Sequence, residues 1–319
     1  MNAVLQCFSN ITRLRCELLQ KDNFNELEKN KLNNQKLSFA LSIVIKNLWE
    51  NIKLNAFQPK YFQKIIIEIY PNILNEPYIE PINLINFILN QMHRELRIVN
   101  IISNQNLFQN NFNDFDLYKK NYEINNNSII IRLFNGYSMR IQKYIQCNNF
   151  INMIENFEFL NFSLNEVKNF KNDNTNYINI YDCFEYFEKI ETIYQFCNNC
   201  SSQYNKQQIK LVYLPQILII NFLYEKNNQN NISIILDESI NLKKYILYNN
   251  ESPYYYELIG VICRLNSEEN QFIAFCKNSD YKCNWYKYHD DKVTKCTFNQ
   301  ILSNEYQIYT LFFSHINKF

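Results

Sequence analysis

Cysteine and histidine side chains are the groups in this sequence that could support nucleophilic chemistry. The 319 residues include 10 Cys and 3 His, and His289 is followed directly by Asp290. The cysteines are spread along the chain without a tight framework, which is typical of a reducing compartment rather than of a disulfide scaffold. We therefore interpret most of them as small buried hydrophobic residues. We expect an intracellular protein, either cytoplasmic or nuclear.

The N-terminal segment MNAVLQCFSN predicts a helix that begins without a capping side chain. Val4, Leu5 and Phe8 fall on one helical face. The Ser, Thr, Asp or Asn that normally precedes such a helix is missing. Two explanations stay open at this point: either Met1 is the true start and an upstream part of the element has been lost, or the segment is not the whole of its first element.

Composition indicates a folded protein that binds neither nucleic acid nor a membrane. Hydrophobic residues make up 47% of the chain and aromatic residues 16%, which is typical of a globular domain. With a net charge of +1, the chain has no overall excess of positive charge that would attract a polyanion. No apolar run reaches the ~18 residues of a spanning helix. The longest, YLPQILIINFLY, is interrupted by Pro215 and Gln216 and predicts a buried strand.

The two parts of the chain have different patterns of hydrophobic residues, which together predict an α+β fold. Residues 1–127 have helical periodicity, clearest after Pro81, where Asn83 is the expected N-cap of an apolar stripe formed by Leu84, Ile85, Ile88, Leu89, Met92 and Leu96. Residues 128–319 contain short β-like runs, namely SIIIRLF, IKLVYLPQILIINF, NISIIL, YYYELIGVICRL, QFIAFCK and YQIYTLFF. The polar stretches 162–178 and 225–233 are the expected inserts. Because the chain has only 2 Gly, we expect Asn to occupy positive-φ turn positions.

Several segments, in this order, resemble the ubiquitin-specific protease family of deubiquitinases. MNAVLQCFSN resembles the start of the family's catalytic helix, and FCNNC resembles one of its zinc knuckles. LPQILIINF, YELIGVICRL, QFIAFCKN, NWYKYHDDKV and IYTLFF resemble its later strands. The resemblance covers nearly the whole chain. It implies a single domain over residues 1–319 with a papain-like cysteine-protease fold, in which a helical thumb (1–127) and a β-rich palm and fingers (128–319) grip ubiquitin by its C-terminal tail.

The resemblance also implies that the catalytic triad is not intact in this chain. The family's nucleophilic Cys would fall two residues before Met1. Gln271 stands at the position of the catalytic His, after Asn270 at that of a Gly, and His289 stands at the position of the orienting Asp or Asn, followed by Asp290. Glutamine has no nitrogen that titrates near neutral pH, so it cannot act as the general base. We therefore expect no hydrolytic activity.

A triad rebuilt from Cys7, His289 and Asp290 is the less favoured alternative. Cys7 would lie about two helical turns beyond the family's nucleophile, roughly 12 Å along the helix. Catalysis requires the reacting groups at contact distance. We therefore interpret Cys7 as a core thiol and His289 as an ordinary polar residue in a strand-end turn. We interpret His93, in QMHRELR, as a surface or packing residue of its helix.

The resemblance implies a weakened grip on the ubiquitin tail. The family's acidic box falls on IEPINL, where Glu80 keeps one negative charge and Asn83 replaces the second acid. Tyr224 replaces the Arg of a later strand motif. Charge-assisted contacts contribute much of such recognition, so we expect ubiquitin, a ubiquitinated protein or another protein as the partner.

The family's zinc site is incomplete by one ligand. Cys197 and Cys200 form one intact knuckle, while the other reads Cys147-Asn-Asn-Phe150 and lacks its second Cys. Cys183 is a candidate for the fourth ligand by proximity in sequence only. Since structural zinc sites are almost always complete, we expect no cofactor, with a structural zinc as the less favoured alternative. Without metal, Phe150 is expected to fill the core of the fingers.

Three functions follow from these residues. The favoured one is a ubiquitin-specific-protease-like protein without hydrolytic activity that binds ubiquitin or a protein partner. The second is an active deubiquitinase whose nucleophile lies upstream and whose base is unconventional. The third is a scaffold that binds neither ubiquitin nor zinc. The substitutions at Gln271, His289 and Asn83 favour the first or the third, and the retained β pattern favours the first.

Overall fold

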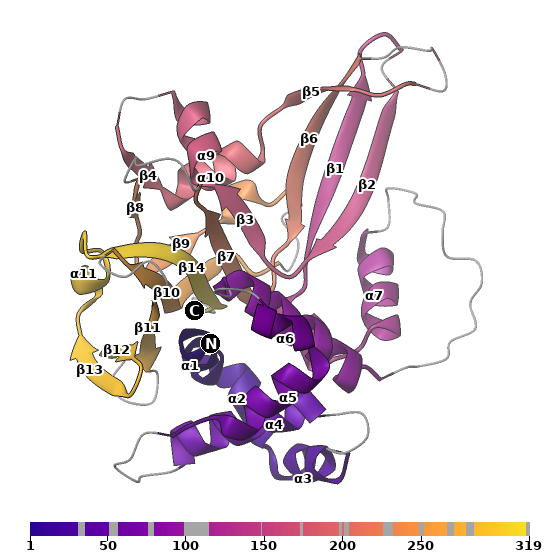
Figure 1. Ribbon diagram of the computed structural model, residues 1–319. Helices are drawn as coiled ribbons and strands as arrows, with labels where there is room; N and C mark the ends of the chain where they lie inside the picture. The colour runs from indigo at the N-terminus through magenta and orange to yellow at the C-terminus, as the bar shows by residue number, and fades with distance from the viewer. Residues whose placement is uncertain are drawn as a thin grey trace. The chain divides into compact units, whose positions relative to one another are not determined.

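The computed structural model divides the chain into two compact units, whose elements are labelled in Figure 1. The first unit consists of Met1–Val99, Asn126–Leu133 and Leu258–Ser314, and the second of Asn100–Asn125, Phe134–Glu257 and His315–Phe319. The structure describes residues 1–30, 36–50, 57–75, 80–98, 115–147, 149–172, 175–197, 200, 204–225, 232–248, 252–266, 271–278 and 284–316.

The N-terminal part of the first unit is helical, as the sequence predicted. Its elements are α1 (Asn2–Asn10), α2 (Thr12–Leu19), α3 (Lys21–Asn30), α4 (Lys36–Glu50), α5 (Lys60–Ile69), the 3₁₀-helix η1 (Pro71–Asn75), α6 (Pro81–Leu96) and α8 (Ile129–Phe134). The predicted stripe of α6 is confirmed, since Leu84, Ile85, Ile88, Leu89 and Met92 are all buried. No helix within the described residues has both the length and the hydropathy needed to cross a membrane.

Antiparallel strands form the sheet of the first unit. Its order is β13 (Lys292–Cys296), β12 (Asn284–His289), β11 (Phe272–Asn278), β10 (Tyr255–Leu265) and β14 (Tyr306–His315). The short helix α11 (Phe298–Ile301) follows β13. Helix α1 packs against β11. The first and last segments of this unit therefore share one core.

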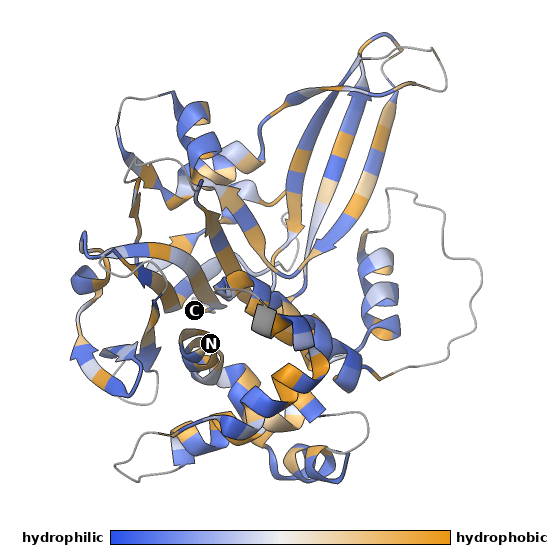
Figure 2. Ribbon diagram, viewed as in Figure 1, coloured by the Kyte–Doolittle hydropathy of each residue, from blue (hydrophilic) through white to orange (hydrophobic). Residues whose placement is uncertain are grey.

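The second unit contains a four-stranded sheet and smaller parallel pairs. The sheet order is β2 (Phe150–Phe157), β1 (Gly136–Tyr144), β6 (Tyr204–Tyr213) and β5 (Glu191–Tyr194). Hydrophobic and hydrophilic residues alternate along β1, β2 and β6 (Figure 2), as in a sheet with one face packed. Aromatic residues of α7 (Phe115–Asn125) pack on this sheet around Tyr137 and Met139.

The remaining elements of the second unit follow the predicted strand pattern. The parallel pairs are β3 (Leu160–Ser163) with β7 (Ile217–Leu223), and β4 (Tyr177–Asn179) with β8 (Ser233–Ile235). Strand β9 (Ser239–Asn241) pairs with the start of β10 and precedes the 3₁₀-helix η2 (Lys243–Tyr245). Helices α9 (Leu164–Lys171) and α10 (Ile180–Phe187) complete the unit. The stretch 162–178, predicted as an insert, thus contains the helix α9.

Two local predictions were wrong. The run SIIIRLF forms helix α8 rather than a strand, because Ser128 caps it: its Oγ accepts the backbone N–H of Ile131 at 3.2 Å. Helix α6 begins at Pro81 with Glu80 as its N-cap, not at Asn83, because the fixed φ of proline suits the first helical position. The expectation that Asn takes positive-φ positions is confirmed at Asn172, with φ of 52°.

His93 joins α6 to the cap of α8. Its Nδ1 lies 2.8 Å from Ser128 Oγ, and since that oxygen also accepts the Ile131 N–H, the hydroxyl is free to donate its proton to a neutral imidazole. Burial lowers the pKa of His93, and the nearby Arg97 and Arg94 lower it further. This supports the interpretation of His93 as a packing residue.

We predict that acid destabilises the protein through His93. Because the pKa is lowered in the folded state, the unfolded chain binds the proton more tightly, so the free energy of unfolding falls as pH drops below about 6.5. Urea denaturation at pH 7.5 and 5.5 measures this, and His93→Gln should reduce the difference between the two values. His289→Gln, on the β12–β13 hairpin, is the matched control. An equal reduction in both variants contradicts the prediction.

Candidate functional site

Helix α1 packs against the sheet of the first unit through a small, buried contact. Cys7 is 1% exposed, and its Sγ lies 3.9 Å from Sγ of Cys276 on β11. A Cβ on Gly260 of β10 would lie 3.3 Å from Cys7 Sγ, so glycine at this position permits the close approach of helix and strand. The ring of Phe8 meets that of Phe312 edge-on, with centroids 6.2 Å apart. The sequence-based interpretation of Cys7 as a buried thiol is confirmed.

The start of β11 and the β12–β13 turn meet at the beginning of α1. Gln271 Nε2 donates a hydrogen bond of 3.2 Å to Asp290 Oδ2. Asp290 occupies the turn with φ of 53°, a conformation that Asp adopts more readily than most residues. Asn2 Nδ2 donates to the Asp290 carbonyl oxygen at 2.9 Å. Three segments far apart in the sequence therefore form one polar cluster, which we call the Gln271–Asp290 cluster and define by Asn2, Gln271 and Asp290.

The Gln271–Asp290 cluster can hold hydrogen bonds but cannot carry a proton between them. The Gln271 amide neither gains nor loses a proton near neutral pH. Its Oε1 is buried and has no hydrogen-bond partner within the described part of the chain. His289, the other predicted site residue, is partly exposed and pairs with Lys292 across the β12–β13 hairpin. The aligned Asn270 lies outside the described residues.

Sequence reasoning missed Asn2 as a member of this site. The residue lies in the first turn of α1, and its contact with Asp290 spans 288 positions of the chain. The uncapped start of the helix was the one signal in the sequence for a contact here. The first backbone N–H groups of a helix have no partners within it, so other polar groups are expected close to a helix start.

The predicted tail-binding residues lie at the start of α6. Glu80 is the N-cap, partly exposed, and its carboxylate makes no capping hydrogen bond. The helix dipole stabilises a negative charge at this end. Asn83 is exposed in the first turn. One carboxylate is thus presented here, and Tyr224 lies just beyond the end of β7, in the second unit.

The three predicted metal ligands come together in the second unit. The sulfur atoms of Cys147, Cys197 and Cys200 all lie within 4.8 Å of one another. They lie where β1 turns into β2 and where β5 leads into β6 (Figure 1). Thiolates are soft donors suited to zinc, and neighbouring sulfurs of a tetrahedral site stand about 3.8 Å apart for Zn–S bonds of about 2.3 Å. The 3.6 Å between the sulfurs of Cys147 and Cys197 fits that spacing.

Two expectations about this region were wrong. Phe150 does not fill a core, because its side chain is 54% exposed at the start of β2, with the Lys143 ammonium 5.3 Å from the centre of its ring. Cys183 does not lie with the other three cysteines, because it is buried on α10. Burial there raises the pKa of its thiol well above the ordinary value.

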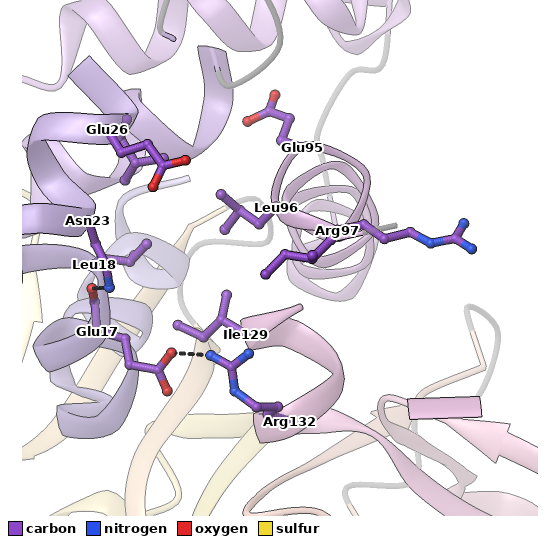
Figure 3. A pocket seen from close by; sticks show the side chains of 11 residues that line it. Glu17, Leu18, Asn23, Glu26, Glu95, Leu96, Arg97, Ile129 and Arg132 are labelled. Atoms are coloured by element: carbon purple, nitrogen blue, oxygen red, sulfur yellow. Dashed lines mark hydrogen bonds and ion pairs between the residues drawn. The ribbon is translucent and has the colours of Figure 1, made fainter. Parts of the chain in front are cut away.

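A pocket lies among the helices of the first unit. Its lining residues do not include Asn2, Gln271 or Asp290. It has a volume of about 280 Å³. An ion pair between Glu17 and Arg132 joins α2 to α8 beside it (Figure 3). In the same view the Arg97 side chain points away from the pocket. Its lining combines leucine and isoleucine side chains with both signs of charge.

Comparison with known proteins identifies the family. Residues 1–313 match the ubiquitin carboxyl-terminal hydrolase family. The class of protein that the fold and this site define is therefore a ubiquitin-specific-protease-type domain with a papain-like fold. The chain belongs to the ubiquitin carboxyl-terminal hydrolase family.

Solved structures support the same fold. One is the yeast SAGA DUBm with a variant Sgf73, at 20% identity and a TM-score of 0.67. Another is the SAGA DUB module of Ubp8, Sgf11, Sus1 and Sgf73 bound to monoubiquitin, at 20% identity and 0.68, and a third is that module bound to ubiquitin aldehyde, also at 20% and 0.68. The matches cover 99% of this chain but only 66%, 66% and 67% of the other chains. A search of curated protein sequences found no match.

We predict that Cys7 resists alkylation in the folded protein. Burial raises the pKa of the Cys7 thiol well above its ordinary value, as does its neighbour Cys276, and only the thiolate reacts. Brief iodoacetamide treatment at pH 8, followed by peptide mass spectrometry, should label Cys7 at least ~100-fold more slowly than the exposed Cys16. Labelling of Cys7 at the rate of Cys16 would show a reactive thiol. Urea should remove the difference.

Proposed function

We propose that this chain is a ubiquitin-binding member of its family that does not hydrolyse ubiquitin conjugates. The observation that carries the proposal is the hydrogen bond between Gln271 and Asp290. By resemblance, Gln271 stands where the family has its general base. An amide in that place keeps the contact with the neighbouring carboxylate but removes the group that accepts and returns a proton.

The energetic consequence of this replacement is large. Losing members of such a triad costs on the order of 10⁴ to 10⁶ in rate, which corresponds to about 5–8 kcal/mol of transition-state stabilisation. Cys7 does not substitute as nucleophile, because its sulfur is buried against Cys276 and its pKa is raised. The proposal thus depends on internal residues and not on where the chain begins.

Ubiquitin is the partner that the remaining features support. Solved structures of this fold include complexes with monoubiquitin and with ubiquitin aldehyde. Glu80 presents a carboxylate at the start of α6, where the resemblance places an acid that contacts the basic ubiquitin tail. We further propose a reducing cytoplasmic or nuclear setting, consistent with the absence of any disulfide among the described cysteines.

The second candidate function is an active deubiquitinase whose nucleophile lies upstream of Met1. The α1 start favours it, because Asn2 brings that end of the helix to the Asp290 turn. An unconventional base would then have to replace Gln271. A scaffold that binds no ubiquitin is the third candidate, favoured by the change of the second tail-binding acid to Asn83.

We predict that the purified chain releases no fluorophore from a ubiquitin C-terminal fluorogenic amide, because Gln271, the side chain bonded to the Asp290 carboxylate, cannot act as a general base. The measurement is steady-state fluorescence with an active family member as reference. Turnover above buffer that alkylation abolishes would contradict the proposal and favour the active enzyme.

The same protein should bind ubiquitin through Glu80. Glu80→Lys is expected to weaken binding about tenfold, or about 1.4 kcal/mol, because it reverses the charge that meets the basic tail. Glu28→Lys, the same change on the exposed face of α3, is the matched control. Calorimetric titration with ubiquitin measures both, and a thermal melt checks their folding. No binding by the unmodified chain would favour the scaffold.

A further inference from the structure

The pocket of about 280 Å³ in the first unit combines apolar walls with charged groups. Its lining residues come from α2, α3, the C-terminal end of α6 and α8, and all of them belong to the first unit. Pockets for drug-sized ligands have volumes of about 300–1,000 Å³. This pocket therefore fits a smaller group, such as one or two amino-acid side chains.

The walls of the pocket are aliphatic. Leu18 and Leu27 are each 3% exposed, and Ile129 is 6% exposed. The side chains of Leu18, Leu96 and Ile129 lie around the same space (Figure 3). Ile98 also lines it and is 56% exposed, so the pocket is open to solvent on that side. An aliphatic group that enters from there leaves water for an apolar surface, which is favourable.

Carboxylates outnumber the cations that face this pocket. The lining contains Glu17, Glu26 and Glu95 against two arginines. Arg132 is paired with Glu17 at 2.5 Å, and the Arg97 side chain points away from the pocket (Figure 3). Glu26 is exposed on α3 and adds a negative charge where the pocket meets solvent. A cleft lined by an excess of one sign of charge attracts the opposite sign, so the lining favours a cationic group.

We propose that this pocket binds a short segment of a partner protein in which an aliphatic side chain lies next to a lysine or an arginine. The aliphatic side chain fills the space between Leu18, Leu96 and Ile129, and the cation lies beside Glu26. Protein interfaces commonly combine a buried anchor side chain with charges at the rim that select the partner. This binding does not depend on the proposed function, because Glu80 and Gln271 are not among the lining residues.

The test is a titration of the full chain, with its Leu and Ile methyl groups isotope-labelled, followed by NMR. The probes are the peptides acetyl-Leu-Lys-amide, acetyl-Leu-Glu-amide and acetyl-Gly-Lys-amide. We expect the first peptide to shift the methyl signals of Leu18, Leu96 and Ile129 until they saturate. Its affinity should be at least ~10-fold higher than that of either other peptide, because one brings a like charge to the carboxylates and the other lacks the anchor.

Two variants with matched controls test the charge and the space separately. Glu26→Lys should lower the affinity for the Leu-Lys peptide at least ~5-fold, whereas Glu28→Lys, on the same helix but outside the lining, should leave it unchanged. Leu96→Phe fills the pocket and should abolish binding of all three peptides. Leu117→Phe, at an exposed leucine of the second unit, should not. Thermal melts establish that each variant is folded.

Three results would overturn the proposal. They are the absence of a saturable shift up to the solubility limit of the Leu-Lys peptide, equal affinities for the Leu-Lys and Leu-Glu peptides, and unchanged binding by Leu96→Phe. Titration of the same variants with ubiquitin separates this site from the proposed ubiquitin contact. Glu26→Lys should bind ubiquitin as the unmodified chain does, and a loss as large as that expected for Glu80→Lys would instead make the pocket part of the ubiquitin site.

Discussion

The packing of α1 on the sheet of the first unit is the constraint on which the candidate site depends. Gly260 leaves room for Cys7 to reach the strands, because a Cβ there would lie 3.3 Å from Cys7 Sγ and the thiol would have to shift by a few tenths of an ångström. With the buried face of α1 fixed, the start of the helix lies within hydrogen-bond reach of the Asp290 turn through Asn2. A packing contact with no chemistry of its own thus sets the geometry of the polar cluster.

Geometry and chemistry are separable at this cluster. A catalytic pair needs two properties, a fixed distance between the groups and a pKa that lets one of them exchange a proton. Gln271 satisfies the first, since its Nε2 lies 3.2 Å from Asp290 Oδ2, but its amide does not exchange a proton near neutral pH. An amide can donate to a carboxylate much as an imidazole does, so the replacement keeps the local hydrogen bond and the fold around it. On the proposed assignment of Gln271 to the general-base position, the replacement has a small structural cost and a large catalytic cost.

The sequence predicted the elements with clear periodicity and failed where context decides. The α6 stripe and the strands β7, β10, β11 and β14 could be predicted, because burial imposes a pattern on them. Helix α8 could not, since periodicity alone does not tell a short apolar run in a helix from one in a strand, and its cap by Ser128 is the deciding contact. The thiol cluster could be predicted from the family's spacing. The exposure of Phe150 and the role of Asn2 could not, because both depend on tertiary placement.

The thiol cluster explains how three cysteines can stay together with or without metal. As neutral thiols, Cys147 and Cys197 can share a weak S–H···S contact at 3.6 Å, whereas three thiolates alone would repel one another. Binding of a metal ion by these thiols would therefore release their protons.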